Sequence, residues 1–173
     1  MTQTLTITKI NREDVPAVVH LINIAYRGEA AQKSWTSEGD YITGARTSED
    51  GIRALMVRPD TDNFKCCNAE EHLLGFVCLE KKPSFVYLSF LTVNPAAQTG
   101  GIGKHMLAFA ETYAQSNRKP AIIITVVNVR HQLIAWYERR GYQLTGKTFP
   151  FPAEAGQVRV PIHLVEMKKD ILP

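Results

Sequence analysis

The stretch Gln98-Thr99-Gly100-Gly101-Ile102-Gly103-Lys104 places three glycines between an apolar run and a helical pattern. The run before it, residues 85–93, is almost continuously apolar, which is typical of a central strand buried on both faces. The pattern after it repeats apolar residues at helical spacing as far as Ser116. Glycines let a backbone approach a ligand closely, and the N–H groups at a helix start favour a pyrophosphate. We therefore expect a phosphate-binding loop that joins a central strand to a helix.

The spacing of this stretch excludes two common nucleotide-binding loops. A Walker loop needs glycine six positions before the lysine and serine or threonine directly after it, but Gln98 and His105 occupy these places. A dinucleotide-binding fingerprint that began at Gly101 would need its third glycine where Met106 stands. A glycine-rich turn without a ligand is the remaining alternative.

The stretch does fit the pattern Gln/Arg-x-x-Gly-x-Gly, through Gln98, Gly101 and Gly103, and it follows the residues Leu-Thr-Val-Asn-Pro at 91–95. In this motif the chain resembles the GNAT superfamily of N-acetyltransferases, whose members bind acetyl-CoA. The resemblance spans most of the chain and includes residues 74–77 and 136–142.

The resemblance implies both a fold and a donor substrate. The fold would be α+β, with about seven mostly antiparallel strands, a central parallel pair that splays apart, and about four helices. The pantetheine arm of acetyl-CoA would enter the gap beside Leu91 and Val93, and its pyrophosphate would meet the loop. The residues so implied in acetyl-CoA binding are Leu91, Thr92, Val93, Gln98, Thr99, Gly100, Gly101, Ile102, Gly103 and Lys104.

One position departs from the family pattern. Many members carry an asparagine seven residues before a tyrosine on the last main helix, and here that place holds Arg130. The nearest asparagine, Asn128, comes two residues earlier. Either Asn128 reaches the CoA arm through a shifted turn, or Arg130 binds a CoA phosphate or the pantetheine amides.

Tyr137 is the candidate catalytic residue. Without the resemblance, a core tyrosine satisfied by one hydrogen bond is the simpler interpretation of this helix position. The family usually places its general acid here, so the resemblance implies that role. A thiol has a pKa of about 8.5 and an ordinary tyrosine about 10, so a protonated Tyr137 suits the protonation of a leaving thiolate.

The segment between residues 28 and 47 is the candidate acceptor pocket, because the resemblance implies that the segment between the first two helices lies over the acyl end of the cofactor. A loop this long in a compact domain also usually has a function. Trp35 offers a rigid apolar surface, and Glu38 can attract a cationic amine. A solvated loop with Trp35 packed on the core is the alternative. Glu29, Glu38 and Glu80 are all open as general bases, and the sequence does not choose among them.

The remaining elements follow from periodicity and breakers, and all of them belong to a single domain over residues 1–173. We expect strands at residues 4–10, 64–68, 73–80, 85–93, 121–127, 143–149 and 163–168, and helices from an Asp14 cap to Tyr26 and at residues 48–57, 101–116 and 131–140.

Composition narrows the classes of protein. Hydrophobic residues make up 45% of the 173 residues and the net charge is +3, so we expect an ordinary folded domain that does not bind nucleic acid. No apolar run approaches the ~18 residues of a membrane span. The start lacks the features of a signal peptide, and adjacent Cys66 and Cys67 suit reduced thiols, which together predict a cytoplasmic protein. The histidines show no metal-binding pattern.

We therefore expect an acetyl-CoA-dependent N-acetyltransferase that acts on a primary amine of a small molecule. Direct transfer in a ternary complex is favoured because no cysteine lies near the loop or Tyr137 in the sequence. A peptide or protein amino group is the second acceptor class, and a non-catalytic CoA-binding regulatory module is the alternative outside enzymes. The oligomeric state is left open, and a homodimer is among the states allowed.

Overall fold

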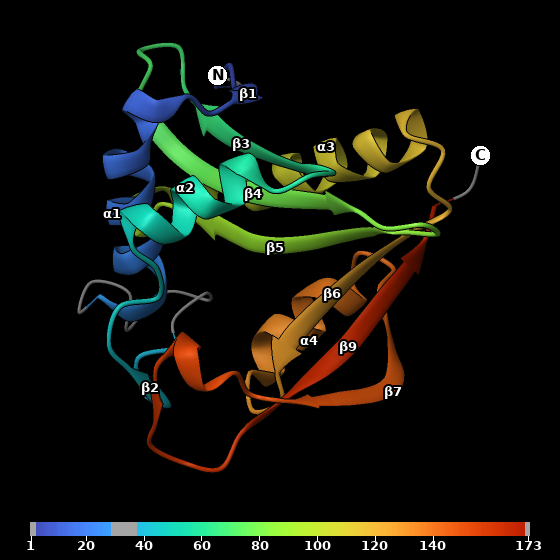
Figure 1. The fold of residues 1–173 in the computed structure, drawn as a ribbon. Coiled ribbons are helices and arrows are strands. Elements are labelled where there is room, and N and C mark those ends of the chain that lie inside the picture. Colours follow the sequence, from blue (N-terminus) through green and yellow to red (C-terminus); the bar gives the residue numbers. More distant parts are fainter. Residues whose placement is uncertain (1–2, 29–37, 172–173) are drawn as a thin grey trace.

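One mixed sheet of seven strands organises the computed structural model, which describes residues 3–28 and 38–171 (Figure 1). Its order is β1-β3-β4-β5-β6-β9-β7, and β5 with β6 forms the parallel pair. The strands are β1 (Thr6–Lys9), β3 (Thr61–Cys67), β4 (Leu73–Lys81), β5 (Val86–Val93), β6 (Ala121–Val127), β7 (Gln143–Pro150) and β9 (His163–Asp170). The predicted α+β fold with a central parallel pair is confirmed.

Four α-helices within the described residues cover the two faces of this sheet (Figure 1). They are α1 (Val15–Arg27), α2 (Glu49–Val57), α3 (Ile102–Ser116) and α4 (His131–Glu138). Alternate residues of β4 belong to two hydrophobic cores on opposite faces of the sheet. Phe76 and Cys78 pack with α1, whereas Val77 and Leu79 pack with α3 and α4. None of these helices combines the length and apolar content needed to cross a membrane.

A bulge and a short pairing shape the centre of the sheet. Phe76 pairs with Thr92 and Cys78 with Ser89, so Phe90 and Leu91 of β5 together oppose one residue of β4. Phe90 takes a φ of 54°, in the left-handed region, and such a bulge bends its strand. The parallel strands β5 and β6 pair at two positions, from Val86 and Tyr87, and then separate.

Local details differ from the sequence expectations. The Asp14 side chain does not cap α1; Asn11 caps a preceding 3-10 turn, while Asp14 pairs with Lys65 at 2.6 Å. Asn11 prevails because its side-chain oxygen accepts from two backbone N–H groups at the start of that turn. α4 also ends at Glu138, before the predicted limit of residue 140.

A second, two-stranded sheet was not predicted at all. β2 (Ile42–Thr43) pairs with β8 (Gln157–Val158) and joins the segment after α1 to the connection between β7 and β9. Strands of two residues carry no readable periodicity, so local sequence gives no signal for them.

Candidate active site

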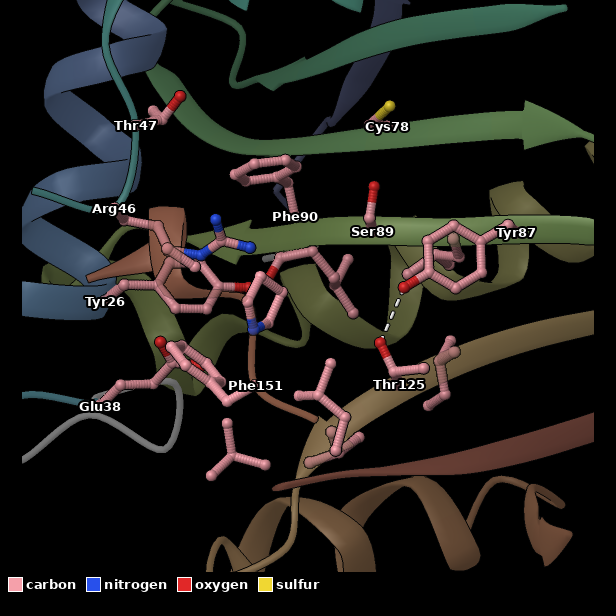
Figure 2. A pocket seen from close by; sticks show the side chains of 18 of the residues that line it. Tyr26, Glu38, Arg46, Thr47, Cys78, Tyr87, Ser89, Phe90, Thr125 and Phe151 are labelled. Carbon is pink, nitrogen blue, oxygen red and sulfur yellow. Dashed lines mark hydrogen bonds between the residues drawn. The ribbon is translucent and has the colours of Figure 1, made fainter. Parts of the chain in front are cut away.

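A cavity of about 730 Å³ fills the space where β5 and β6 separate (Figure 2). One wall comes from residues 88–91 of β5 and the opposite wall from residues 124–127 of β6. Further lining comes from the helices α1, α2 and α4, from β4, and from residues 45–48 and the connection at residues 151–155. This cavity, called the cleft below, collects side chains from segments far apart in the sequence.

A hydrogen bond closes the narrow side of the cleft. The hydroxyls of Tyr87 on β5 and Thr125 on β6 lie 2.7 Å apart, where the pairing of the two strands ends (Figure 2). Glu80, the register partner of Tyr87 on β4, also lines this end and accepts a bond of 2.6 Å from Lys82. Of the three carboxylates considered as bases, Glu80 and Glu38 therefore line the cleft, and Glu29 lies outside the described residues.

Tyr137 lines the cleft from α4 and is buried, with 5% of its surface exposed. Its ring packs edge to face against Trp136 and Tyr142, at centroid distances of 5.0 and 5.4 Å. Burial raises the pKa of Tyr137, more than the nearby Arg130 lowers it. The phenol therefore holds its proton at neutral pH and can donate it to a group in the cleft.

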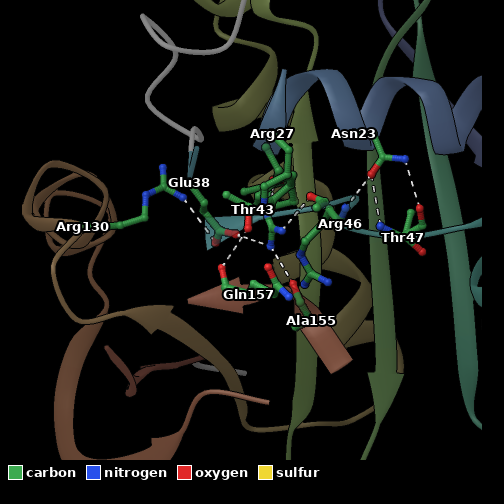
Figure 3. A network of polar contacts seen from close by, with 12 residues as sticks. Asn23, Arg27, Glu38, Thr43, Arg46, Thr47, Arg130, Ala155 and Gln157 are labelled. Carbon is green, nitrogen blue, oxygen red and sulfur yellow. Dashed lines mark hydrogen bonds and ion pairs between the residues drawn. The ribbon is translucent and has the colours of Figure 1, made fainter. Parts of the chain in front are cut away.

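Two arginines share the carboxylate of Glu38, a residue that lines the cleft (Figure 3). Arg27 binds one oxygen at 3.1 Å, and Arg130 lies 3.7 Å from the other. Glu38 is 8% exposed. It does face the cleft, as an acceptor-binding residue must, but the two guanidinium groups offset the attraction for a cationic amine that the sequence suggested. Trp35, the other expected acceptor residue, lies outside the described residues.

The two residues at the family departure have different surroundings. Asn128 accepts a hydrogen bond of 3.0 Å from the N–H of His163, and its own N–H donates to the carbonyl of His163, so it ties the end of β6 to β9. Arg130 is buried beside Glu38 and lines the cleft. Which of the two contacts CoA stays a prediction.

The glycine loop has the shape that a pyrophosphate requires. A 3-10 turn, Pro95–Gly100, leads into Gly101, whose φ of 72° is left-handed, and α3 begins directly afterwards. A Cβ added at Gly101 would meet no atom within 4 Å, so the space in front of this residue is open. The first N–H groups of α3 have no carbonyl within their own helix to bind, which suits an anion.

The residues of the loop divide between the core and the surface. Ile102 and Gly103 are buried, while Gly100, Gly101 and Lys104 are exposed and open to a ligand. The side chains of Gln98 and Thr99 lie outside the described part of the structure. The residues present fit a phosphate group at this place.

The side chains of the three β5 residues predicted to bind acetyl-CoA, Leu91, Thr92 and Val93, are mostly buried. Leu91 lines the cleft, and its carbonyl accepts a hydrogen bond of 2.9 Å from the hydroxyl of Tyr26. Thr92 and Val93 are buried, and the Thr92 hydroxyl donates to the carbonyl of Phe90 at 2.7 Å. The sequence placed Tyr26 on the apolar face of its helix and gave no reason to assign it to the site.

Several further residues of the cleft escaped sequence reasoning. Arg46 follows α1 in an irregular segment, Cys78 lies in a buried strand, and Phe151 belongs to the β7–β9 connection. Burial raises the pKa of the Cys78 thiol to about 11, so the thiol stays protonated and is a poor nucleophile. Within residues 3–28 and 38–171, no group of three or more His, Cys, Asp or Glu side chains is placed to hold a metal ion.

Comparisons with known proteins bear on this geometry. The model of the acetyltransferase (GNAT) family matches residues 20–142. The fold is similar to that of the ribosomal-protein-S18-alanine N-acetyltransferase from Escherichia coli, with a TM-score of 0.71, 17% identity, and coverage of 98% of this chain and 96% of that chain. No curated protein matches the chain significantly.

Two other solved structures share the fold at similar distance. A chimera of spermidine N-acetyltransferase from Vibrio cholerae aligns with a TM-score of 0.69 and 16% identity over 96% of this chain and 95% of that chain. Nourseothricin acetyltransferase aligns with a TM-score of 0.68 and 16% identity over 97% of this chain and 99% of that chain.

Proposed function

Because the chain belongs to the acetyltransferase (GNAT) family, in which acetyl-CoA is the donor, we propose that it acetylates the primary amine of a small molecule by direct transfer in a ternary complex. The names of its structural neighbours include both kinds of acceptor, a ribosomal-protein alanine on one side and spermidine or nourseothricin on the other. At such low identity these similarities describe the fold alone. The acceptor class therefore has to be inferred from the size and lining of the cleft.

The size of the cleft and its wall at residues 151–155 carry the proposal for a small acceptor. Its volume of about 730 Å³ lies within the usual range for small-molecule sites. The pairing of β2 with β8 fixes residues 151–155 beside it, and Arg27 donates to the carbonyl of Ala155 at 2.9 Å (Figure 3). An extended polypeptide acceptor would need an open groove or a free strand edge, whereas here the β7–β9 connection supplies a wall.

The residues of the chain suit the steps of this reaction. When bound, acetyl-CoA supplies the acetyl thioester. The loop before α3 would hold its pyrophosphate, and the β5 backbone at Leu91 and Val93 would orient its arm. Tyr137 holds a proton at its hydroxyl for a leaving thiolate. Cys78, the cysteine that lines the cleft, stays protonated, which favours direct transfer over an acyl-enzyme.

Thiol release from acetyl-CoA over a panel of amines, amino acids and peptides tests the proposal. We expect small amines to be acetylated and peptides to react poorly. Faster acetylation of peptides would assign the second acceptor class. Acetyl-CoA binding without turnover on any member of a broad panel would favour a regulatory module.

The donor site needs its own test, by calorimetry with Gly101→Val. The new side chain would occupy the open space before α3 and strain a left-handed backbone, so acetyl-CoA binding should be lost. Gly146→Val is the matched control, because Gly146 also has a positive φ, of 88°, and open space around it, but lies in β7. Unchanged affinity in a folded Gly101→Val variant would contradict the assignment of the loop.

A further inference from the structure

Positive charge exceeds negative charge around the hydroxyl of Tyr26, which lines the cleft. The charges of Arg46, Glu38 and Arg130 all act on the hydroxyl of Tyr26, and Arg27 lies on the other side of Glu38. Three guanidinium groups thus lie around one carboxylate, and two of them pair with it. The oxygens of Glu38 face Arg27 and Arg130, so Arg46 is the cation that the carboxylate does not pair.

The chain holds Arg46 in a fixed position. The side-chain oxygen of Asn23 accepts from the N–H of Arg46 at 2.7 Å and from that of Thr47 at 3.1 Å, while its amide group donates to the carbonyl of Thr47 (Figure 3). The guanidinium lies 4.2 Å from the centroid of the Phe90 ring and 5.6 Å from that of Tyr26 (Figure 2). A clamped backbone and two aromatic contacts leave the arginine little freedom to lose when a ligand binds.

Stacking leaves the hydrogen-bonding edge of this guanidinium available. Cation–π contacts use the face of the group, whereas its five N–H donors lie in the plane and match a carboxylate or phosphate in bidentate fashion. Within the described residues, no carboxylate lies within ion-pair distance of Arg46. A partly buried cation that is held in place without an acidic partner is suited to an anionic ligand.

We propose that the acceptor amine carries an anionic group, a carboxylate or a phosphonate, and that Arg46 binds this group. The proposal rests on the acetyltransferase function proposed above and names its acceptor class. The position of Arg46 suits this role: its guanidinium stacks on Phe90, the residue before Leu91, and the Leu91 carbonyl binds Tyr26. The anion would therefore lie close to the backbone at which the pantetheine arm of acetyl-CoA is expected.

The same surroundings favour an apolar side chain on the acceptor. Phe90 and Phe151 line the cleft near Arg46 (Figure 2), and Val126 and Leu133 also line the cleft. An amine that combines an anionic group with an apolar side chain, as a neutral amino acid does, matches both features of this wall.

Matched amines test the proposal. We would measure kcat/KM for L-leucine, for its phosphonate analogue 1-amino-3-methylbutylphosphonic acid, and for isopentylamine, which lacks the anion. L-Phenylalanine and phenethylamine form a second pair. An α-amino group loses its proton more easily than an alkylamine, which by itself changes kcat/KM. The kcat/KM of the anionic amine divided by that of its uncharged partner is therefore compared between wild type and variant.

In Arg46→Met the advantage of the anionic member should fall by about 10- to 100-fold, as expected for the loss of a charge-assisted hydrogen bond. Arg46→Lys should restore part of it, because the charge returns without the planar fork. Arg58→Met is the control, because Arg58 is another arginine of the cleft but lies near Cys78 and Glu80. In this variant the kcat/KM ratio within each pair should stay unchanged, even if both values fall. Comparing leucine with its phosphonate shows which anion the site prefers.

The outcomes separate this inference from the proposed function. Wild type that neither binds acetyl-CoA nor acetylates any amine contradicts the function itself. Turnover with the same ratio in wild type and Arg46→Met contradicts only the role of Arg46. If acetyl-CoA binds normally, but leucine and its phosphonate are neither acetylated nor bound in calorimetry, the anionic acceptor class is wrong. Calorimetry with acetyl-CoA on Arg46→Met should give wild-type affinity.

Discussion

A phenol enclosed by two aromatic rings keeps its proton where a solvated one begins to lose it. Tyr137 is in this situation, between Trp136 and Tyr142, and burial is the main reason that its pKa is raised. The acid form is therefore present throughout the neutral range and above the ordinary tyrosine pKa of about 10. This environment suits a general acid, because the hydroxyl stays protonated and can donate its proton at neutral pH.

Tyr137→Phe should lower kcat by about 100-fold or more while the affinity for acetyl-CoA stays nearly unchanged, since general acid catalysis usually contributes that much. Because its pKa is raised, Tyr137 should cause no fall in wild-type kcat between pH 7 and pH 9.5. Steady-state kinetics across that range would check both points.

Tyr142→Phe is the matched control, because Tyr142 touches Tyr137 but its buried hydroxyl has no partner in the described structure. Its loss should leave kcat unchanged. Normal turnover in Tyr137→Phe would show that another group protonates the thiolate and that Tyr137 is structural.

Individual residues differ in how far the sequence can identify them. Tyr137 and the loop glycines stand at fixed spacings within local motifs, so the sequence alone is enough to propose them. Arg46 has no such motif around it. Its role depends on contacts with Asn23 in α1 and with Phe90 in β5, and these residues come close to Arg46 only in the folded chain.

At the scale of elements, the close packing of α3 against β4 depends on Gly75, which has no side chain. A Cβ added at Gly75 would overlap the sulfur of Met106 on α3 and would lie 3.0 Å from the carbonyl oxygen of Thr92 on β5. The methionine can move, but the backbone oxygen cannot. The start of α3 carries the glycine loop, so this contact also sets where the loop lies relative to the sheet.

Gly75→Ala should lower the free energy of unfolding by about 1–3 kcal/mol, as overpacking of a well-filled core usually does. Urea denaturation would measure the loss, and calorimetry would show whether acetyl-CoA affinity falls with it. Met106→Ala made alone and in combination gives the control. If the contact with Met106 causes the strain, the double variant should be more stable than the sum of the two single effects predicts. Strict additivity would place the strain at the Thr92 carbonyl instead.

The strands and helices themselves were largely predictable, because long buried runs and helical periodicity are local properties. β6 occupies the expected residues 121–127, and β5 begins one residue later than expected. The bulge at Phe90 and Leu91 was not predictable, since it is a property of the register between two strands. The same holds for the β2–β8 pair, which depends on where two distant loops meet.

At the scale of the whole molecule, the sheet consists of two parts that meet at its weakest pairing. One part is β1-β3-β4-β5 and the other is β6-β9-β7, and β5 and β6 share two register pairs before they diverge. The cleft occupies the remaining length of this junction. The topology could be expected from the family resemblance, but the lining of the cleft could not, because it combines both parts with residues 45–48 and 151–155.

A donor bound along this junction would contact both parts of the sheet, so acetyl-CoA should stabilise the molecule as a whole. At about 100 times Kd, binding contributes about 2.7 kcal/mol, which for a chain of this size corresponds to a rise in Tm of about 5–10 °C. Differential scanning fluorimetry would measure the shift, which Gly101→Val should abolish and Tyr137→Phe should retain. Hydrogen exchange then locates the effect. Slower exchange in both β4–β5 and β6–β9 is expected if the arm lies in the cleft, whereas protection confined to the loop and α3 would show that the donor binds through its phosphates alone and leaves the junction open.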